Sequence, residues 1–186
     1  MRKRATQNKK IQLHLGCGEK YIPGFVHIDA RKFSHIDYVA RVDKLGMFED
    51  NSVDLIYACH LLEHFKRSEV GNVLREWYRV LKPRGVLRLA VPDFEQLVKI
   101  YQKTKDIQLI LGPLVGRQDY PENIHFIAFD YALLSEFCKG AGFKIVRRYD
   151  WRKTIHKDYD DFSQAYIPHM DKENGTLISL NVEAVK

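Results

Sequence analysis

The sequence has little of several features that mark other protein classes. Its 186 residues include only three cysteines, widely spaced and without a Cys-x-x-Cys pair. That pattern is not a disulfide framework, so we expect reduced thiols and a cytoplasmic protein. The apolar runs are far shorter than the ~20 residues of a membrane-spanning helix. The first ten residues also lack the apolar centre of a secretion signal.

Charge is unevenly distributed along the chain. Thirty Lys and Arg against 24 Asp and Glu leave a formal net charge of +6. Five of the cations lie in residues 1–10, which contain no acid. Residues 1–10 are therefore predicted to be a basic flexible tail, and residues 11–186 to form a single, nearly neutral domain. A nucleic-acid partner is not expected, although the tail keeps an RNA-directed function open as an alternative.

Strand and helix patterns alternate after the tail. Helical periodicity predicts helices from Ser68 to about Leu81, after Asp93 and after Asp130. The alternation predicts an α/β fold with a doubly wound, mostly parallel seven-stranded sheet and an antiparallel last strand. The apolar segments that predict the strands are residues 11–15, 24–30, 36–42, 53–59, 86–91, 143–151 and 176–186.

Three of the predicted strands end in residues suited to a nucleoside. The first ends in Gly16-Cys17-Gly18, where a ligand can approach the backbone closely because two residues have no β-carbon. Asp29 and Asp43 end the next two strands, and their carboxylates suit a ribose and an adenine amino group. A dinucleotide is disfavoured because Tyr21 replaces the third glycine of that fingerprint, and no P-loop motif is present. An uncharged nucleoside carrying an amino acid, S-adenosylmethionine, fits better.

Three segments resemble a known family. Leu13–Gly18 is similar to the first motif of class I S-adenosylmethionine-dependent methyltransferases. Phe48–His64 resembles their fourth-strand signature ending in Leu-Glu-His, and Trp77–Leu89 resembles the stretch entering their fifth strand. The likeness covers about residues 11–92 and is closest to a small bacterial-type branch, similar to methyltransferase type 11. It implies a Rossmann-like methyltransferase fold with S-adenosyl-L-methionine as the cofactor.

The resemblance also implies a cofactor site. Only ten residues separate Gly18 from Asp29, so the first helix of the family is expected to be shortened. Lys20 or Arg31 is then expected near the carboxylate of the cofactor. The residues expected to contact the cofactor are Gly16, Cys17, Gly18, Asp29, Ala30, Asp43, Lys44, Leu45, Cys59 and His60.

The acceptor is expected to be a hydroxyl of a small molecule or a glycan. Such an acceptor benefits from a base, and the candidates are His125, His60 and Asp93, with His125 preferred. A non-catalytic S-adenosylmethionine-binding module remains a further alternative. The residues expected to bind the acceptor are His64, Asp119, Tyr120, Tyr159 and Tyr166.

One motif also resembles a metal site. His60-Leu61-Leu62-Glu63-His64 matches the His-x-x-Glu-His pattern of inverted zinc peptidases. Such a site needs these residues within a long helix and a third protein ligand elsewhere. Here the motif follows a strand and belongs to the Leu-Glu-His signature, so no metal is predicted.

Overall fold

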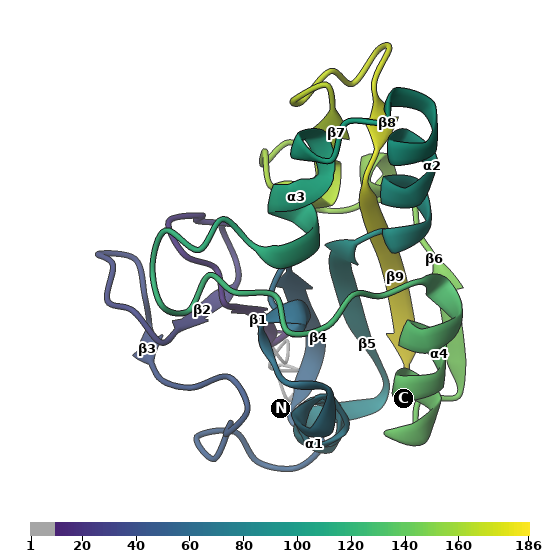
Figure 1. The fold of residues 1–186 in the computed structure, drawn as a ribbon. Coiled ribbons are helices and arrows are strands. Elements are labelled where there is room, and N and C mark those ends of the chain that lie inside the picture. Colours follow the sequence, from purple (N-terminus) through teal and green to yellow (C-terminus); the bar gives the residue numbers. More distant parts are fainter. Residues whose placement is uncertain (1–9) are drawn as a thin grey trace, which may run out of the picture.

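The computed structural model describes residues 10–186, so the predicted basic tail lies almost entirely outside the described residues. These residues form one seven-stranded sheet in the order β3-β2-β1-β4-β5-β9-β6 (Figure 1). The chain winds outward from β1 first to β2 and β3, and then to β4 and β5, as a doubly wound sheet does. The strands are β1 (Gln12–Leu15), β2 (Val26–Asp29), β3 (Tyr38–Val39), β4 (Val53–Cys59), β5 (Leu81–Pro92), β6 (Ile145–Arg148) and β9 (Ser179–Val185).

The last strand lies inside the sheet. β9 pairs antiparallel with both β5 and β6, whereas the pairs among β1 to β5 are parallel. The predicted antiparallel last strand is confirmed, and β6 rather than β9 forms the edge. A small separate hairpin is made by β7 (Tyr166–Ile167) and β8 (Thr176–Leu177).

Local signals set most helix ends. The carboxylate of Asp93 accepts the backbone N–H groups of Glu95 and Gln96, and that of Asp130 accepts the N–H of Leu133, so both predicted caps are confirmed. Ser68 does not cap its helix. The first helix begins one residue earlier, and the N–H of Lys66 before it is bound by the carboxylate of Glu69. The helices are α1 (Arg67–Val80), α2 (Phe94–Thr104), α3 (Gln108–Val115) and α4 (Tyr131–Gly140).

The helices divide between one face and one end of the sheet. α1 and α4 contact each other and pack on one face, where Trp77 is fully buried and its Nε1 donates to the carbonyl of Val42 at 2.8 Å. α2 and α3 gather beyond the carboxyl ends of β4 and β5 (Figure 1). There Leu97, Ile100 and Ile110 form a small separate core. The helices therefore leave the carboxyl ends of β1 and β2 uncovered by a helix.

The opposite face is covered by loops. The connection between β1 and β2 contains turns but no helix, which goes further than the shortened helix expected. His14 on this face is buried, stacks on Tyr57 at 5.2 Å between ring centroids, and lies among other histidines. Burial, with smaller contributions from neighbouring histidines, lowers the pKa of His14 to about 3. The hydroxyl of Tyr57 donates to Asp161, which ties residues 149–164 to this face.

Two observations bear on cellular location. Cys17, Cys59 and Cys138 are all free thiols. None of the helices in the described part of the chain is both long and apolar enough to cross a membrane.

Candidate functional site

A cavity of about 390 Å³ lies at the carboxyl ends of β1, β2 and β4. Its volume is within the ~300–1,000 Å³ typical of small-molecule sites. A larger groove of about 570 Å³, between α2 and α4, contains none of the predicted site residues. The smaller cavity is lined by Gly16, Asp29, Ala30, Arg31, Arg41, Val42, Asp43, His60, Leu61, His64, Phe65, Glu69, Tyr120, Pro121, Glu122 and Phe126.

Half of the predicted cofactor residues line this cavity, namely Gly16, Asp29, Ala30, Asp43 and His60. The other five, Cys17, Gly18, Lys44, Leu45 and Cys59, do not.

The structure shows why three of these five residues do not line the cavity. Leu45 is fully buried, and its N–H is already bound by the carboxylate of Glu76 at 2.7 Å. Cys59 packs with the apolar cluster on the opposite face of the sheet. Cys17 is buried, and burial raises the pKa of its thiol to about 12.

The carboxylate of Asp29 is hydrogen-bonded to backbone N–H groups of the glycine loop and of the residues after β2. One of its oxygens accepts the N–H of Gly18 and the other accepts the N–H of Arg31, both at 2.8 Å. The carboxylate is buried, with 6% of the residue exposed. Each oxygen of a carboxylate accepts about two hydrogen bonds, so each retains one position for a ligand hydroxyl.

The carboxylate of Asp43 is engaged in an ion pair. Arg41 binds it through two hydrogen bonds, from Nε at 3.0 Å and from Nη2 at 2.8 Å. This pairing lowers the pKa of Asp43. The carboxylate therefore borders the cavity as half of an ion pair.

The floor of the cavity joins the ends of β1 and β4. Gly16 has φ +59°, and a β-carbon there would lie 2.5 Å from a methyl carbon of Leu61. His60 also has a positive φ, 47°, which is uncommon for a residue with a side chain. A glycine at position 16 thus satisfies both the backbone conformation and the close approach of the two strand ends.

Arg31 connects two sides of the cavity. Its guanidinium lies 4.6 Å from the ring centroid of Tyr120, a cation–π contact. It also reaches the glycine loop, because a β-carbon on Gly18 would lie 3.5 Å from a guanidinium nitrogen. The side chain therefore bridges the end of β2 and the segment that follows α3.

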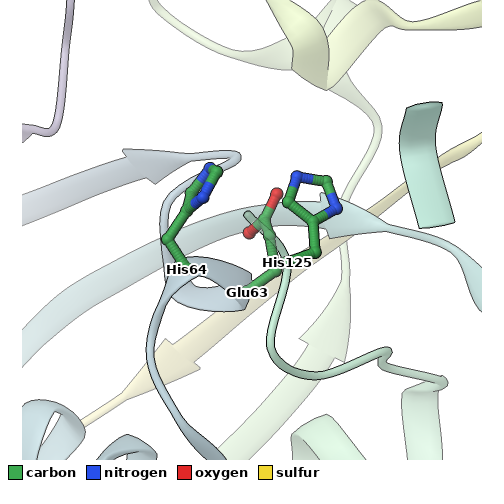
Figure 2. Close-up of side chains that lie close together, drawn as sticks. All are labelled: Glu63, His64 and His125. Carbon is green, nitrogen blue, oxygen red and sulfur yellow. The ribbon is translucent and has the colours of Figure 1, made fainter. Parts of the chain in front are cut away.

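Glu63, His64 and His125 form a compact cluster next to the cavity (Figure 2). Glu63 and His64 belong to the short 3-10 turn after β4 (Leu62–His64), and His125 comes from the segment after α3. Glu63 is fully buried, and burial raises its pKa to about 8. The rings of His64 and His125 are 4.8 Å apart between centroids.

Burial also affects the histidines of this region. It lowers the pKa of His125 to about 4 and that of His60 to about 3, and it lowers the pKa of His64 as well. All three rings are therefore neutral at pH 7 and present one nitrogen with a lone pair.

Backbone hydrogen bonds fix His125 beside His64. The N–H of His125 donates to the carbonyl of Val115 and closes the intervening loop. The next N–H, of Phe126, donates to the carbonyl of Glu63 at 2.8 Å. Gly116 permits this closure, since its φ is +79° and a β-carbon would collide with the carbonyl of Asn123.

Comparisons with known proteins concern the domain and the fold. The family model described as a methyltransferase domain matches residues 18–89. A search of curated proteins found no match. The fold resembles an S-adenosylmethionine-dependent methyltransferase of Archaeoglobus fulgidus, with TM-score 0.61, 13% identity and coverage of 96% of this chain and 87% of that chain.

Two further solved structures share the fold. An S-adenosylmethionine-dependent methyltransferase of Mesorhizobium loti is 16% identical, with TM-score 0.53 and coverage of 96% of this chain and 91% of that chain. The 1,6-didemethyltoxoflavin-N1-methyltransferase of Burkholderia thailandensis, solved with S-adenosylhomocysteine, is 13% identical, with TM-score 0.57 and coverage of 95% and 70%. Residues 18–89 thus match a methyltransferase domain, and the fold of the chain is that of S-adenosylmethionine-dependent methyltransferases. The cofactor that this likeness implies is S-adenosylmethionine.

The residues that line the cavity fit this cofactor. The cavity is large enough, its floor is a glycine with no side chain, and the buried Asp29 keeps free acceptor positions. Arg31 supplies a cation next to the glycine loop, where the sequence left either Lys20 or Arg31. The missing helix between β1 and β2 removes the usual positive helix end, and this arginine supplies positive charge in its place.

One candidate base and two residues predicted to bind the acceptor lie elsewhere. Asp93 is 2% exposed and is engaged as the cap of α2 and by Arg148 at 3.3 Å, so it does not line the cavity. Tyr166 is buried in β7, where its hydroxyl accepts a hydrogen bond from Arg152. Tyr159 does not line the cavity either.

Two of the residues predicted to bind the acceptor do line the cavity. Tyr120 and His64 line the cavity, whereas Asp119 and His125, the preferred base, do not. The carboxylate of Asp119 accepts a hydrogen bond from the side chain of Asn123. Sequence reasoning missed Glu122 and Phe126, which line the cavity two and six residues after Tyr120. Their positions in the sequence could have indicated them, since Glu122 lies between the predicted residues Tyr120 and His125, and Phe126 follows His125 directly.

Proposed function

We propose that the protein is an S-adenosylmethionine-dependent methyltransferase that methylates a hydroxyl group of a small molecule or a glycan. The observation that carries the proposal is the pair of neutral histidines, His64 and His125, beside a rim formed by Tyr120, Glu122 and Phe126. Aromatic rings suit stacking against a sugar or an aromatic acceptor, and a carboxylate suits hydroxyl groups. Phe126 is 51% exposed and Tyr120 36%, so both rings are accessible from solvent.

The cofactor is proposed to lie along the floor of the cavity. The ribose hydroxyls would be bound by Asp29, and the adenine would lie near Asp43 and Val42. The carboxylate of the methionine part would be bound by Arg31. The methyl group would then face His64, which lines the same cavity.

The cofactor supplies a methyl group on a positively charged sulfur, so that an acceptor oxygen can displace it directly, yielding a methyl ether and S-adenosylhomocysteine. The methyltransferase must align the acceptor and remove its hydroxyl proton. We assign the proton to Nε2 of His125. Its Nδ1 lies 2.9 Å from the carbonyl of Pro113 and must donate there, which leaves the lone pair on Nε2.

The test is methyl transfer from S-adenosylmethionine to a panel of phenols, catechols, monosaccharides and nucleotide sugars, with S-adenosylhomocysteine as the readout. The expected result is turnover with at least one hydroxyl acceptor and a loss of roughly 10²–10⁴-fold in kcat on His125→Ala, the usual contribution of a base. His169→Ala is the matched control, because His169 is exposed and does not line the cavity.

The alternatives give different outcomes. An RNA-directed enzyme would methylate RNA and lose salt-dependent RNA binding on removal of residues 1–10. A non-catalytic binding module would bind S-adenosylhomocysteine yet form no product with any acceptor. We also propose a cytoplasmic location, which the free thiols support.

A further inference from the structure

Glu63 is a buried acid without the partners that such a group normally has. The residue is 0% exposed, and neither carboxylate oxygen has a hydrogen-bond partner within residues 10–186. The nearest ionisable group is Nδ1 of His60, 3.4 Å from one oxygen. A buried polar group without a hydrogen-bond partner is destabilising, so it calls for an explanation, and a bound ion is one.

The two neighbouring histidines are oriented as metal ligands are. Nδ1 of His64 lies 3.1 Å from the carbonyl of Ile124, and Nδ1 of His125 lies 2.9 Å from the carbonyl of Pro113. A carbonyl accepts only, so each Nδ1 carries the proton and each Nε2 carries the lone pair. A backbone carbonyl bound to the second nitrogen is the arrangement that fixes and orients a metal-ligating histidine.

The three donor groups are close together. One ligand atom each from Glu63, His64 and His125 lies within 4.8 Å of the others (Figure 2). Ligands about 2.1 Å from a tetrahedral ion are roughly 3.4 Å apart, so closure around an ion needs side-chain shifts of about 1 Å. Two imidazoles and a carboxylate form a donor set suited to zinc and other divalent transition metals, with open positions for a further ligand.

We propose that Glu63, His64 and His125 bind a divalent transition-metal ion, represented by Zn²⁺, at the acceptor side of the cofactor cavity. The sequence motif His-x-x-Glu-His was not interpreted as a zinc site, because it follows a strand and belongs to the Leu-Glu-His signature, whereas such a site needs a long helix and a third ligand. The fold supplies the third ligand from the segment after α3, and the short turn after β4 replaces the helix.

An ion at this place has a specific chemical role. His64 lines the cavity, so an open coordination position could receive the hydroxyl of an acceptor and lower its pKa, with the hydroxyl proton released to bulk water. His125 would then be a ligand, and the ion would replace it as the group that activates the hydroxyl. This role rests on the proposed function, whereas binding of the ion does not depend on the acceptor.

The experiment uses the full chain after treatment with a chelator and removal of the chelator. Co²⁺ is titrated in as a coloured probe, followed by displacement with Zn²⁺, and Mg²⁺ serves as the hard-cation comparison. The expected result is one Co²⁺ per chain with visible absorption bands of nitrogen and oxygen coordination, displaced by Zn²⁺ and not by Mg²⁺. Glu63→Gln and His125→Ala should each weaken binding by more than the roughly 10–100-fold that loss of a supporting partner costs.

S-Adenosylhomocysteine binding is measured on every variant to confirm that the fold is retained, and His169→Ala is the control. The proposal is overturned if folded protein binds no Co²⁺, or if both ligand variants bind it as the unmodified protein does. Methyl transfer is then assayed with and without Zn²⁺. Metal binding without any turnover would contradict the proposed function and support the metal site. Turnover without metal binding would support the proposed function and contradict the metal site.

Discussion

Replacement of Asp29 gives the sharpest test of the cofactor site. The carboxylate of Asp29 accepts the N–H groups of Gly18 and Arg31 and keeps acceptor positions for the two ribose hydroxyls. Hydrogen bonds to a charged group are worth about 1.5–3 kcal/mol each. Loss of both ribose bonds in Asp29→Ala, about 3 kcal/mol at the lower end, corresponds to roughly a hundredfold weaker binding of S-adenosylhomocysteine.

A matched control separates this effect from loss of stability. Asp37 lies beside the same strand and accepts the N–H of His27 at 2.8 Å, but it does not line the cavity. Asp37→Ala should therefore reduce stability by about 1 kcal/mol, as the loss of one hydrogen bond does, and leave the affinity unchanged. In Asp29→Ala two backbone N–H groups lose their acceptor, so we expect a loss of about 1–2 kcal/mol.

Calorimetric titration with S-adenosylhomocysteine and with adenosine measures the affinities, and thermal unfolding measures stability. Both ligands carry the ribose, so both should bind more weakly to Asp29→Ala. If this variant retains native circular dichroism and binds both ligands within about threefold of the unmodified protein, a threefold change being under 1 kcal/mol, the ribose assignment is refuted.

Three further predictions concern the glycine loop, the arginine and the buried histidine. Gly16→Ala places a β-carbon at φ +59° against Leu61, and a left-handed conformation costs about 1–2 kcal/mol in a residue with a side chain. Calorimetry should therefore give a weaker affinity for S-adenosylhomocysteine. Unchanged affinity would contradict the close-approach argument. Arg31→Ala should weaken S-adenosylhomocysteine binding about tenfold, or ~1.4 kcal/mol, without affecting 5′-methylthioadenosine, which lacks the carboxylate, and Lys20→Ala should change neither. The pKa of His14 is lowered from 6.5 to about 3, so below pH 6.5 the unfolded chain binds a proton that the folded chain does not. His14 should thus lower the free energy of unfolding by about 1.4 kcal/mol for each pH unit as the pH drops from 6.5 toward 3. Urea titrations at several pH values should show that the free energy of unfolding falls less steeply with pH in His14→Gln than in the unmodified protein.

Elements defined by short-range signals were predictable. The strand at residues 53–59 was placed correctly because an apolar run, interrupted only by Asp54, stands between the Asn51-Ser52 turn and His60. The caps at Asp93 and Asp130 were also correct, since an aspartate before a helical pattern satisfies free N–H groups locally. α3, with Pro113 inside it, was not predicted, because it packs on α2 despite a proline that discourages a helix.

Roles that depend on distant contacts were not determined by the sequence. Asp93 and Asp29 both follow predicted strands, yet Arg148 and the start of α2 engage the first, whereas the second faces a cavity. The same limit applies to the approach of His125 to Glu63, which closure of the loop after α3 brings about.

The sequence by itself thus determined the doubly wound, mostly parallel sheet, the glycine loop and the acid at the end of β2, and it predicted the class of cofactor. These follow from hydrophobic period, turn chemistry and residues at strand ends, which are properties of neighbouring residues. The tertiary structure alone decided that β9 inserts between β5 and β6, that Arg31 reaches the glycine loop, and that a carboxylate and two histidines converge beside the cavity. Such contacts form only when packing of the whole chain repays the entropy of closing long loops, and no local pattern encodes that balance.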